Sequence, residues 1–77
     1  MSRLPIIDFR TMDRLLREFG FEPVRQKGSH VFFRHTDGRT TVVPDHGPAD
    51  LARPLIADIL KDIRVSADEY RALLESL

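Results

Sequence analysis

The 77-residue sequence contains no cysteine and no tryptophan, and none of its apolar runs is longer than four residues. The absence of cysteine excludes disulfide bonds, thiolate nucleophiles and zinc–thiolate sites. Apolar runs such as residues 4–7 and 54–57 are too short for a transmembrane helix or for the core of a signal peptide. We therefore expect a soluble, cytoplasmic protein that does not associate with a membrane.

The chain is long enough for one small domain, which we place at residues 1–77 because no linker, repeat or low-complexity segment divides it. With 42% hydrophobic and 31% charged residues, the composition is that of a globular chain rather than a disordered one. A chain of this size buries only about 60% of the surface that its unfolded form exposes. Its stability must therefore come from apolar packing alone or from a partner chain.

The formal net charge is zero, but the charges are unevenly distributed. Residues 25–44 carry four basic side chains and one acidic side chain, whereas residues 45–77 carry four basic and seven acidic ones. A net charge of zero argues against a general nucleic-acid coat protein. The asymmetry suggests one basic face for a polyanion, and ordinary scatter in a small protein is an equally good explanation.

Apolar periodicity predicts a helix followed by three strands. Asp8 can cap a helix whose apolar residues recur at spacings of three and four, and Gly20 is typical of the residue just past a helix. From residue 21 onward the period changes to two, which predicts strands at residues 22–26, 29–35 and 39–43.

Two turns and two further helices complete the predicted fold. Lys27-Gly28 is expected to form the first turn, and Asp37-Gly38 predicts a hairpin in which both central residues adopt positive φ. Pro54 suits the first turn of a second helix. Ser66 with Glu69 predicts a capping box for a short last helix. The predicted class is an α+β sandwich, α-β-β-β-α, with a three-stranded antiparallel sheet and the helices on one of its faces.

Strand alternation divides the second strand between the two faces of this sheet. Val31 and Phe33 point one way, while His30, Phe32 and Arg34 point the other way. If the helices cover the face that carries Val31 and Phe33, the opposite face stays open to solvent.

His30 is the first candidate for chemistry, because it stands where a hairpin opens onto a strand beside basic side chains. An imidazole titrates near neutral pH, so it can remove a proton from a ribose 2′-hydroxyl or give one to a leaving oxygen. Neighbouring cations would hold the phosphate and stabilise the charge of the transition state. A lone strand histidine is, however, more often solvated or structural than catalytic.

Arg25, Lys27 and Arg34 are candidates for a phosphate-binding patch, since alternation places all three on the face of His30. Phe32 lies on the same face, where an exposed aromatic ring beside cations can stack on an unpaired base. Each cation taken singly is consistent with a solvated surface, and Phe32 is equally consistent with contact to a partner protein.

A metal site is not expected. His30 and His35 fall on opposite faces of a regular strand, and no carboxylate or thiolate stands at a ligand-like spacing to join them and His46. A Ser29–His30 nucleophile pair is also unlikely, because adjacent residues of a strand face apart.

Several short motifs, taken together, resemble the HicA toxin family of messenger-RNA interferases. They are Gly20-Phe21, Arg25-Gln26-Lys27-Gly28-Ser29-His30, Phe33, His35, Asp37-Gly38-Arg39, Val43-Pro44 and His46. The similarity extends from Leu4-Pro5 to Tyr70 and covers nearly the whole chain. Two departures fall at helix ends: Pro54-Leu55-Ile56 replaces the usual Gly-Thr-Leu, and Arg64 stands where the family often has glycine.

The resemblance implies a double-stranded-RNA-binding-like fold and an endoribonuclease that cuts messenger RNA, with His30 as its catalytic residue. A HicB-type antitoxin would inhibit the enzyme, and operator DNA would be bound only through that antitoxin. We expect a metal-independent transesterification without any cofactor, in which His30 is the single catalytic histidine and Lys27 and Arg34 stabilise the transition state. The sequence supplies no clear second proton-transfer group, so either His30 serves both steps or water completes one of them. The expected RNA-binding residues are Arg25, Lys27, Ser29, Phe32 and Arg34.

Two other classes of function remain open at this point. A non-catalytic RNA-binding module would keep its cellular effect when His30 is replaced. A protein-interaction domain would use the open face, including Phe32, for another chain and would not bind RNA in a salt-dependent way.

Overall fold

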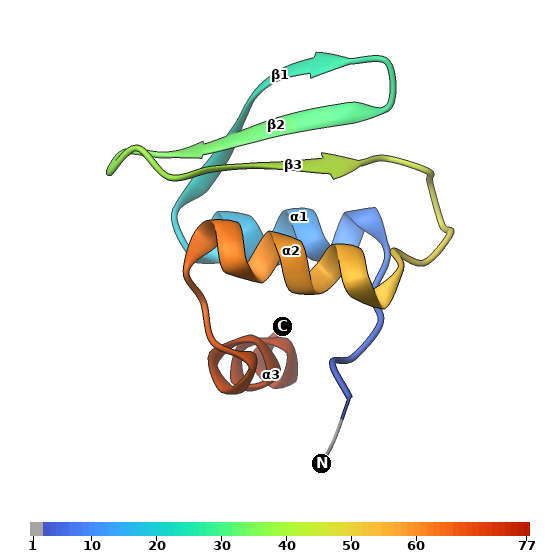
Figure 1. The fold of residues 1–77 in the computed structure, drawn as a ribbon, viewed down its shortest axis with the longest axis vertical. Helices are drawn as coiled ribbons and strands as arrows, with labels where there is room; N and C mark the ends of the chain where they lie inside the picture. Colours follow the sequence, from blue (N-terminus) through green and yellow to red (C-terminus); the bar gives the residue numbers. More distant parts are fainter. Residues whose placement is uncertain (1–2) are drawn as a thin grey trace.

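The computed structural model describes residues 3–77 (Figure 1). A helix is followed by three strands and two further helices, which confirms the predicted α-β-β-β-α order and the α+β class. The elements are α1 (Phe9–Glu18), β1 (Phe21–Lys27), β2 (His30–His35), β3 (Thr40–Pro44), α2 (Arg53–Ile63) and α3 (Ala67–Ser76). No helix within residues 3–77 is long and apolar enough to cross a membrane.

The first helix forms where its cap and its apolar stripe predict it. The Asp8 carboxylate accepts a hydrogen bond from the Thr11 N–H at 3.0 Å, and this bond lowers the pKa of Asp8. Met12, Leu15 and Leu16 on one side of α1 are completely buried. Gly20 ends the helix at a φ of 92°, and a Cβ there would lie 2.8 Å from His35 Nε2. Only glycine fits this junction without strain.

The three strands form an antiparallel sheet in the order β1-β2-β3. The two residues between β1 and β2 are Gly28 and Ser29, so the first turn is shifted by one residue from the predicted Lys27-Gly28. Gly28 has a φ of 58°, as expected for the first central position of a type II′ turn. The second hairpin also differs from the prediction, because Gly38 has a positive φ and Asp37 does not. Its longer connection, residues 36–39, removes the need for two left-handed residues.

The first two helices cover the same face of the sheet, with α1 packed under β1 and α2 under β3 (Figure 1). The core lies between these layers and includes Phe21, Val31, Phe33 and Val43 from the strands. Among residues 3–77, no helix covers the opposite face of the sheet (Figure 1). This arrangement confirms that the His30 face of β2 is the open one.

The C-terminal helix α3 lies beyond α2, away from the sheet (Figure 1). Ser66 and Glu69 form the predicted capping box. Tyr70 is completely buried, and its hydroxyl donates to the Pro5 carbonyl at 2.6 Å. This bond joins α3 to the segment that precedes α1.

The second helix begins one residue before Pro54, so the proline occupies the first turn as predicted. Its C-terminal end at Arg64 is unusual, because Arg64 adopts the left-handed conformation with φ 57° and ψ 44°. Arg64 is the only residue other than glycine with a positive φ in the part of the chain that the structure describes. The departure from glycine at this position therefore leaves a strained helix end.

Candidate functional site

The open face of the sheet consists of three rows of side chains that run across the strands. In an antiparallel sheet, residues paired across strands point to the same face, so the register defines each row. The rows are Lys27–His30–Pro44, Arg25–Phe32–Val42 and Glu22–Arg34–Thr40.

His30 is exposed at the first position of β2, directly after the Gly28-Ser29 turn. Its cross-strand partner on β1 is Lys27, which is also exposed. Side chains paired in this way have Cβ atoms about 5 Å apart. Of the cations on the open face, Lys27 is therefore the one in the row of His30.

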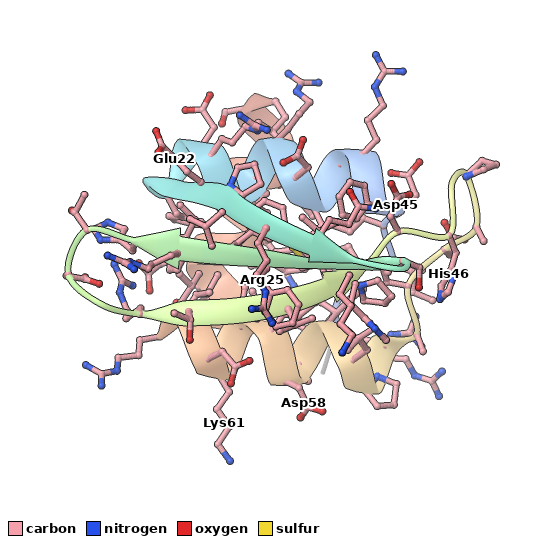
Figure 2. The ribbon with its side chains drawn as sticks, turned by 90° about the horizontal axis from the view of Figure 1, so that it is seen from above. Glu22, Arg25, Asp45, His46, Asp58 and Lys61 are labelled. Carbon is pink, nitrogen blue, oxygen red and sulfur yellow. The ribbon has the colours of Figure 1, made fainter. Side chains whose placement is uncertain are left out.

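The second row brings a cation and an aromatic ring into contact. The Arg25 guanidinium carbon lies 4.6 Å from the centre of the Phe32 ring. Arg25 extends over the middle of the sheet when the open face is viewed directly (Figure 2). As a result Phe32 is only partly exposed, contrary to the prediction of an exposed ring. A planar guanidinium over an aromatic face is a favourable cation–π arrangement, and its outer side can stack on a base.

The third row is less basic than the sequence suggests. Arg34 lies on the open face as predicted, but its cross-strand partner is Glu22. A bulge between Pro23 and Arg25 shifts the β1 register and brings this carboxylate to the open face. At about 3.3 Å per residue, the Arg34 row lies about 13 Å from the His30 row. This separation favours contact of Arg34 with a different phosphate group from the one beside His30.

Ser29 belongs to the turn between β1 and β2. Its carbonyl accepts a hydrogen bond from the Asp45 N–H at 2.6 Å, which extends the β2–β3 ladder beyond Pro44. The turn that precedes His30 is thus tied to the loop that follows β3. Nothing in the structure pairs the Ser29 hydroxyl with the imidazole of His30.

His35 and Arg39 have structural partners away from the open face. The His35 ring packs against Phe21 with 5.1 Å between centroids, and its Nδ1 accepts the Asp37 N–H at 3.0 Å. Arg39 donates from Nε to Asp37 at 2.8 Å and from Nη1 to the Ile63 carbonyl at the end of α2. Hydrogen bonds from Arg39 lower the pKa of Asp37. The Arg39 charge, counted in the basic segment, is therefore not part of the open face.

His30 and His35 lie on opposite sides of β2, in agreement with the alternation. Within residues 3–77 there is no cluster of three or more His, Cys, Asp or Glu side chains that could hold a metal ion. A surface depression lies between the start of α1 and the loop after β3. It is lined by Asp8, Phe9, Arg10, Asp45, Gly47 and Pro48.

His46 is a residue whose position the sequence did not reveal. It follows β3 by two residues and is exposed beside the tip of the β1–β2 hairpin (Figure 2). In the sequence, His46 stands among the motifs of the HicA resemblance and otherwise suggests only a metal ligand that lacks partners. The pairing of Pro44 with His30, which brings His46 into their neighbourhood, follows from the β3 register and not from any local motif.

Comparison with known proteins agrees with this arrangement. A search of curated proteins gave no match to the chain. The family model for the HicA toxin of bacterial toxin–antitoxin systems matches residues 9–65, from the first residue of α1 to just past the end of α2. This span includes all three strands, the whole open face and His46, and amounts to well over half of the chain. The chain therefore belongs to the HicA toxin family.

Proposed function

We propose that this toxin is a metal-independent endoribonuclease that cleaves messenger RNA through His30. The observation that carries the proposal is the row formed by His30 and Lys27 on an uncovered sheet face. An exposed imidazole reaches the ribose, and a cation beside it neutralises the phosphate at which the reaction occurs. Family membership supports the toxin role, and the open face supports RNA as the ligand.

The proposed reaction is a transesterification. His30 takes the proton of a ribose 2′-hydroxyl, and the resulting oxygen nucleophile attacks the adjacent phosphorus. The bond from phosphorus to the 5′-oxygen breaks, leaving a cyclic phosphate and a free 5′-hydroxyl. Lys27 stabilises the additional negative charge on the phosphate oxygens.

The two other rows would hold the strand on either side of that phosphate. Arg25 and Phe32 together offer one flat surface for an unpaired base. Arg34, two rows from His30, would contact a different phosphate, partly offset by the nearby carboxylate of Glu22. Ser29 would contribute through the turn that positions His30. RNA would thus lie along β2.

We also propose that a HicB-type antitoxin neutralises the toxin by covering the same face. Acidic side chains would pair with Lys27 and Arg34 as phosphates do, and an apolar side chain would pack beside Phe32. Operator DNA would be bound only through that antitoxin.

The decisive experiment compares the wild-type protein with His30→Ala in growth arrest and in cleavage of a purified message in excess EDTA. Loss of a general base slows such a reaction by typically 10²–10⁴-fold. Because His30 is exposed, the variant should keep the wild-type circular dichroism spectrum and melting temperature. Lys61→Ala on the outer side of α2 is the matched surface control (Figure 2).

A folded His30→Ala protein that still arrests growth would contradict the catalytic assignment and favour a non-catalytic binding module. Cleavage that stops in EDTA and returns with a divalent ion would replace the mechanism with a metal-assisted one. A wild-type protein that binds no RNA at any ionic strength would favour a protein-interaction domain.

A further inference from the structure

The cleavage proposed for His30 needs a second proton transfer. When the 2′-oxygen attacks phosphorus, the departing 5′-oxygen carries negative charge and must gain a proton. A base that has just accepted the 2′-hydroxyl proton lies on the attacking side, whereas an in-line displacement places the leaving oxygen on the opposite side of phosphorus. A separate acid near His30, displaced from it along the RNA strand, would accelerate this step by supplying that proton.

The end of β3 brings the loop that carries His46 close to His30. Pro44 is the cross-strand partner of His30, so it faces the open side of the sheet. The hydrogen bond from the Asp45 N–H to the Ser29 carbonyl continues the ladder by one more residue. Asp45 turns toward α1 and lines the depression beside Asp8. His46, the next residue, is exposed beside the tip of the β1–β2 hairpin (Figure 2).

The loop that carries His46 is held at several points. The Asp45 carboxylate accepts the Gly47 N–H at 3.0 Å, which forms a tight turn around His46. The Leu51 N–H donates to the Ile7 carbonyl at 2.9 Å, which fastens the other end of the loop to the segment before α1. His30 follows Ser29 and His46 follows Asp45, so each histidine is one residue away from the hydrogen bond that joins Asp45 to Ser29. That arrangement allows two side chains to approach one phosphodiester from different sides.

The other ionisable groups near His30 are less suited to this role. Lys27 already serves as the cation that neutralises the phosphate, and an ammonium group is a poor general acid at neutral pH. The Asp45 side chain lies on the α1 side of the loop (Figure 2). An imidazolium, by contrast, gives up its proton in the neutral range.

We propose that His46 is the general acid of the reaction, which donates its proton to the 5′-oxygen while His30 accepts the proton of the 2′-hydroxyl. The 2′-oxygen–phosphorus bond forms and the phosphorus–5′-oxygen bond breaks. One proton enters the protein at His30 and one leaves at His46, so exchange with water restores both rings. This inference rests on the proposed ribonuclease function.

A substrate with a sulfur atom in place of the scissile 5′-oxygen tests the role of His46 directly. A thiolate leaves without needing a proton, so loss of a general acid is harmless for this substrate, whereas loss of the general base is not. The cleavage site is first mapped on a natural message, and short oligonucleotides with 5′-oxygen or 5′-sulfur at that bond are then compared. The proteins are wild type, His30→Ala, His46→Ala and His46→Gln, with Asp50→Ala as an exposed control in the same loop.

We expect both His46 variants to cleave the oxygen substrate about 10²–10³-fold more slowly than wild type. They should cleave the sulfur substrate within a few-fold of wild type, while His30→Ala is slow on both. Equal losses on the two substrates would overturn the proposal and show a binding or folding role for His46. Full activity of both His46 variants on the oxygen substrate would also overturn it. A wild-type protein that cleaves neither substrate would instead refute the ribonuclease function itself.

Discussion

The Arg25 guanidinium covers the Phe32 ring with 4.6 Å between the guanidinium carbon and the ring centre. The two residues are direct partners across β1 and β2, so the contact is fixed by the sheet register. The positive charge of Arg25 and the flat ring of Phe32 therefore lie together at the centre of the open face. RNA bound there would meet the guanidinium before it meets the ring.

Removing each member of this pair should affect RNA binding differently. Arg25→Gln removes one phosphate or stacking contact and should reduce the slope of log affinity against log salt by roughly 0.7, the value for one phosphate on a single strand. Phe32→Leu should weaken binding by about 1–3 kcal/mol with an unchanged slope, because stacking carries no net charge. Fluorescence titrations of single-stranded RNA from low to high salt would measure both quantities. If wild type and Arg25→Gln have the same slope of log affinity against log salt, Arg25 covers the Phe32 ring but does not contact a phosphate.

Lys27 should act mainly in the chemical step, whereas Arg34 should act mainly in binding RNA. Lys27 shares a row with His30, whereas Arg34 lies about 13 Å along the strand. We expect Lys27→Gln to lower kcat by about 10²-fold, within the range of removing one electrostatic stabiliser. Arg34→Gln should raise KM and leave kcat nearly unchanged. Steady-state cleavage of one oligonucleotide by both variants is the measurement, and a kcat loss in Arg34→Gln would place its charge at the scissile phosphate.

Charge reversal of the same two residues should also weaken binding of the antitoxin to the toxin. Lys27→Glu and Arg34→Glu place repulsion at the surface that we propose the antitoxin covers, so RNA cleavage and antitoxin affinity should fall together. Calorimetric titration with the cognate antitoxin measures the second quantity. Lys61→Glu on α2 is the control and should change neither (Figure 2). Variants that lose cleavage but bind the antitoxin at full strength would indicate inhibition from another surface.

The bond from the Tyr70 hydroxyl to the Pro5 carbonyl should contribute measurably to stability. Tyr70→Phe leaves that carbonyl without its donor and should lower the free energy of unfolding by about 1–2 kcal/mol. Burial raises the pKa of Tyr70 to about 12, above the ordinary value near 10. Between these two values the unfolded chain loses the phenolic proton and the folded chain keeps it. Wild-type stability should therefore fall with rising pH by up to about 1.4 kcal/mol per pH unit from this group.

Tyr70→Phe removes this contribution, so its stability should depend less on pH above 10. Urea unfolding of both proteins at pH 8 and at several alkaline values gives the comparison. Parallel losses in the two proteins across the alkaline range would mean that another group causes the dependence.

Arg64→Gly should make the protein more stable. Arg64 holds a left-handed conformation that costs a residue with a Cβ about 1–2 kcal/mol, and the greater flexibility of glycine in the unfolded chain offsets part of the gain. The expected net change is an increase of about 0.5–1 kcal/mol in the free energy of unfolding. Chemical denaturation measures it, and Arg64→Ala serves as the control because it keeps the strain. Equal effects of glycine and alanine would assign the change to the lost charge instead.

Local signals were sufficient for most of the fold. The Asp8 cap, the capping box at Ser66 and the change from a period near 3.6 to a period of two each depend on residues close in sequence. They predicted the helices and strands to within one or two residues. The location of His30 on the open face also followed, because strand alternation alone decides it.

The incorrect predictions concern contacts between elements that are distant in sequence. Simple alternation places Glu22 on the opposite face from Arg25, but the β1 bulge brings both to the open side. Phe32 is covered by Arg25 because Arg25 is its cross-strand partner. The position of His46 depends on the pairing of Pro44, at the end of β3, with His30. Arg39 was counted with the free cations because its partner at the end of α2 is distant in sequence. None of these pairings has a local sequence signal.

The bulge in β1 has a further consequence for how other proteins can approach the sheet. β1 is an edge strand, and an exposed edge normally offers a row of backbone N–H and carbonyl groups to which another strand can add. Pro23 has no N–H to offer, and the irregular backbone at Val24 interrupts the regular spacing of the remaining groups. A foreign strand would find only short, mismatched stretches along this edge. Partners that bind along β1 must therefore recognise side chains on the face of the sheet, and copies of the toxin are hindered from joining into larger sheets through this edge.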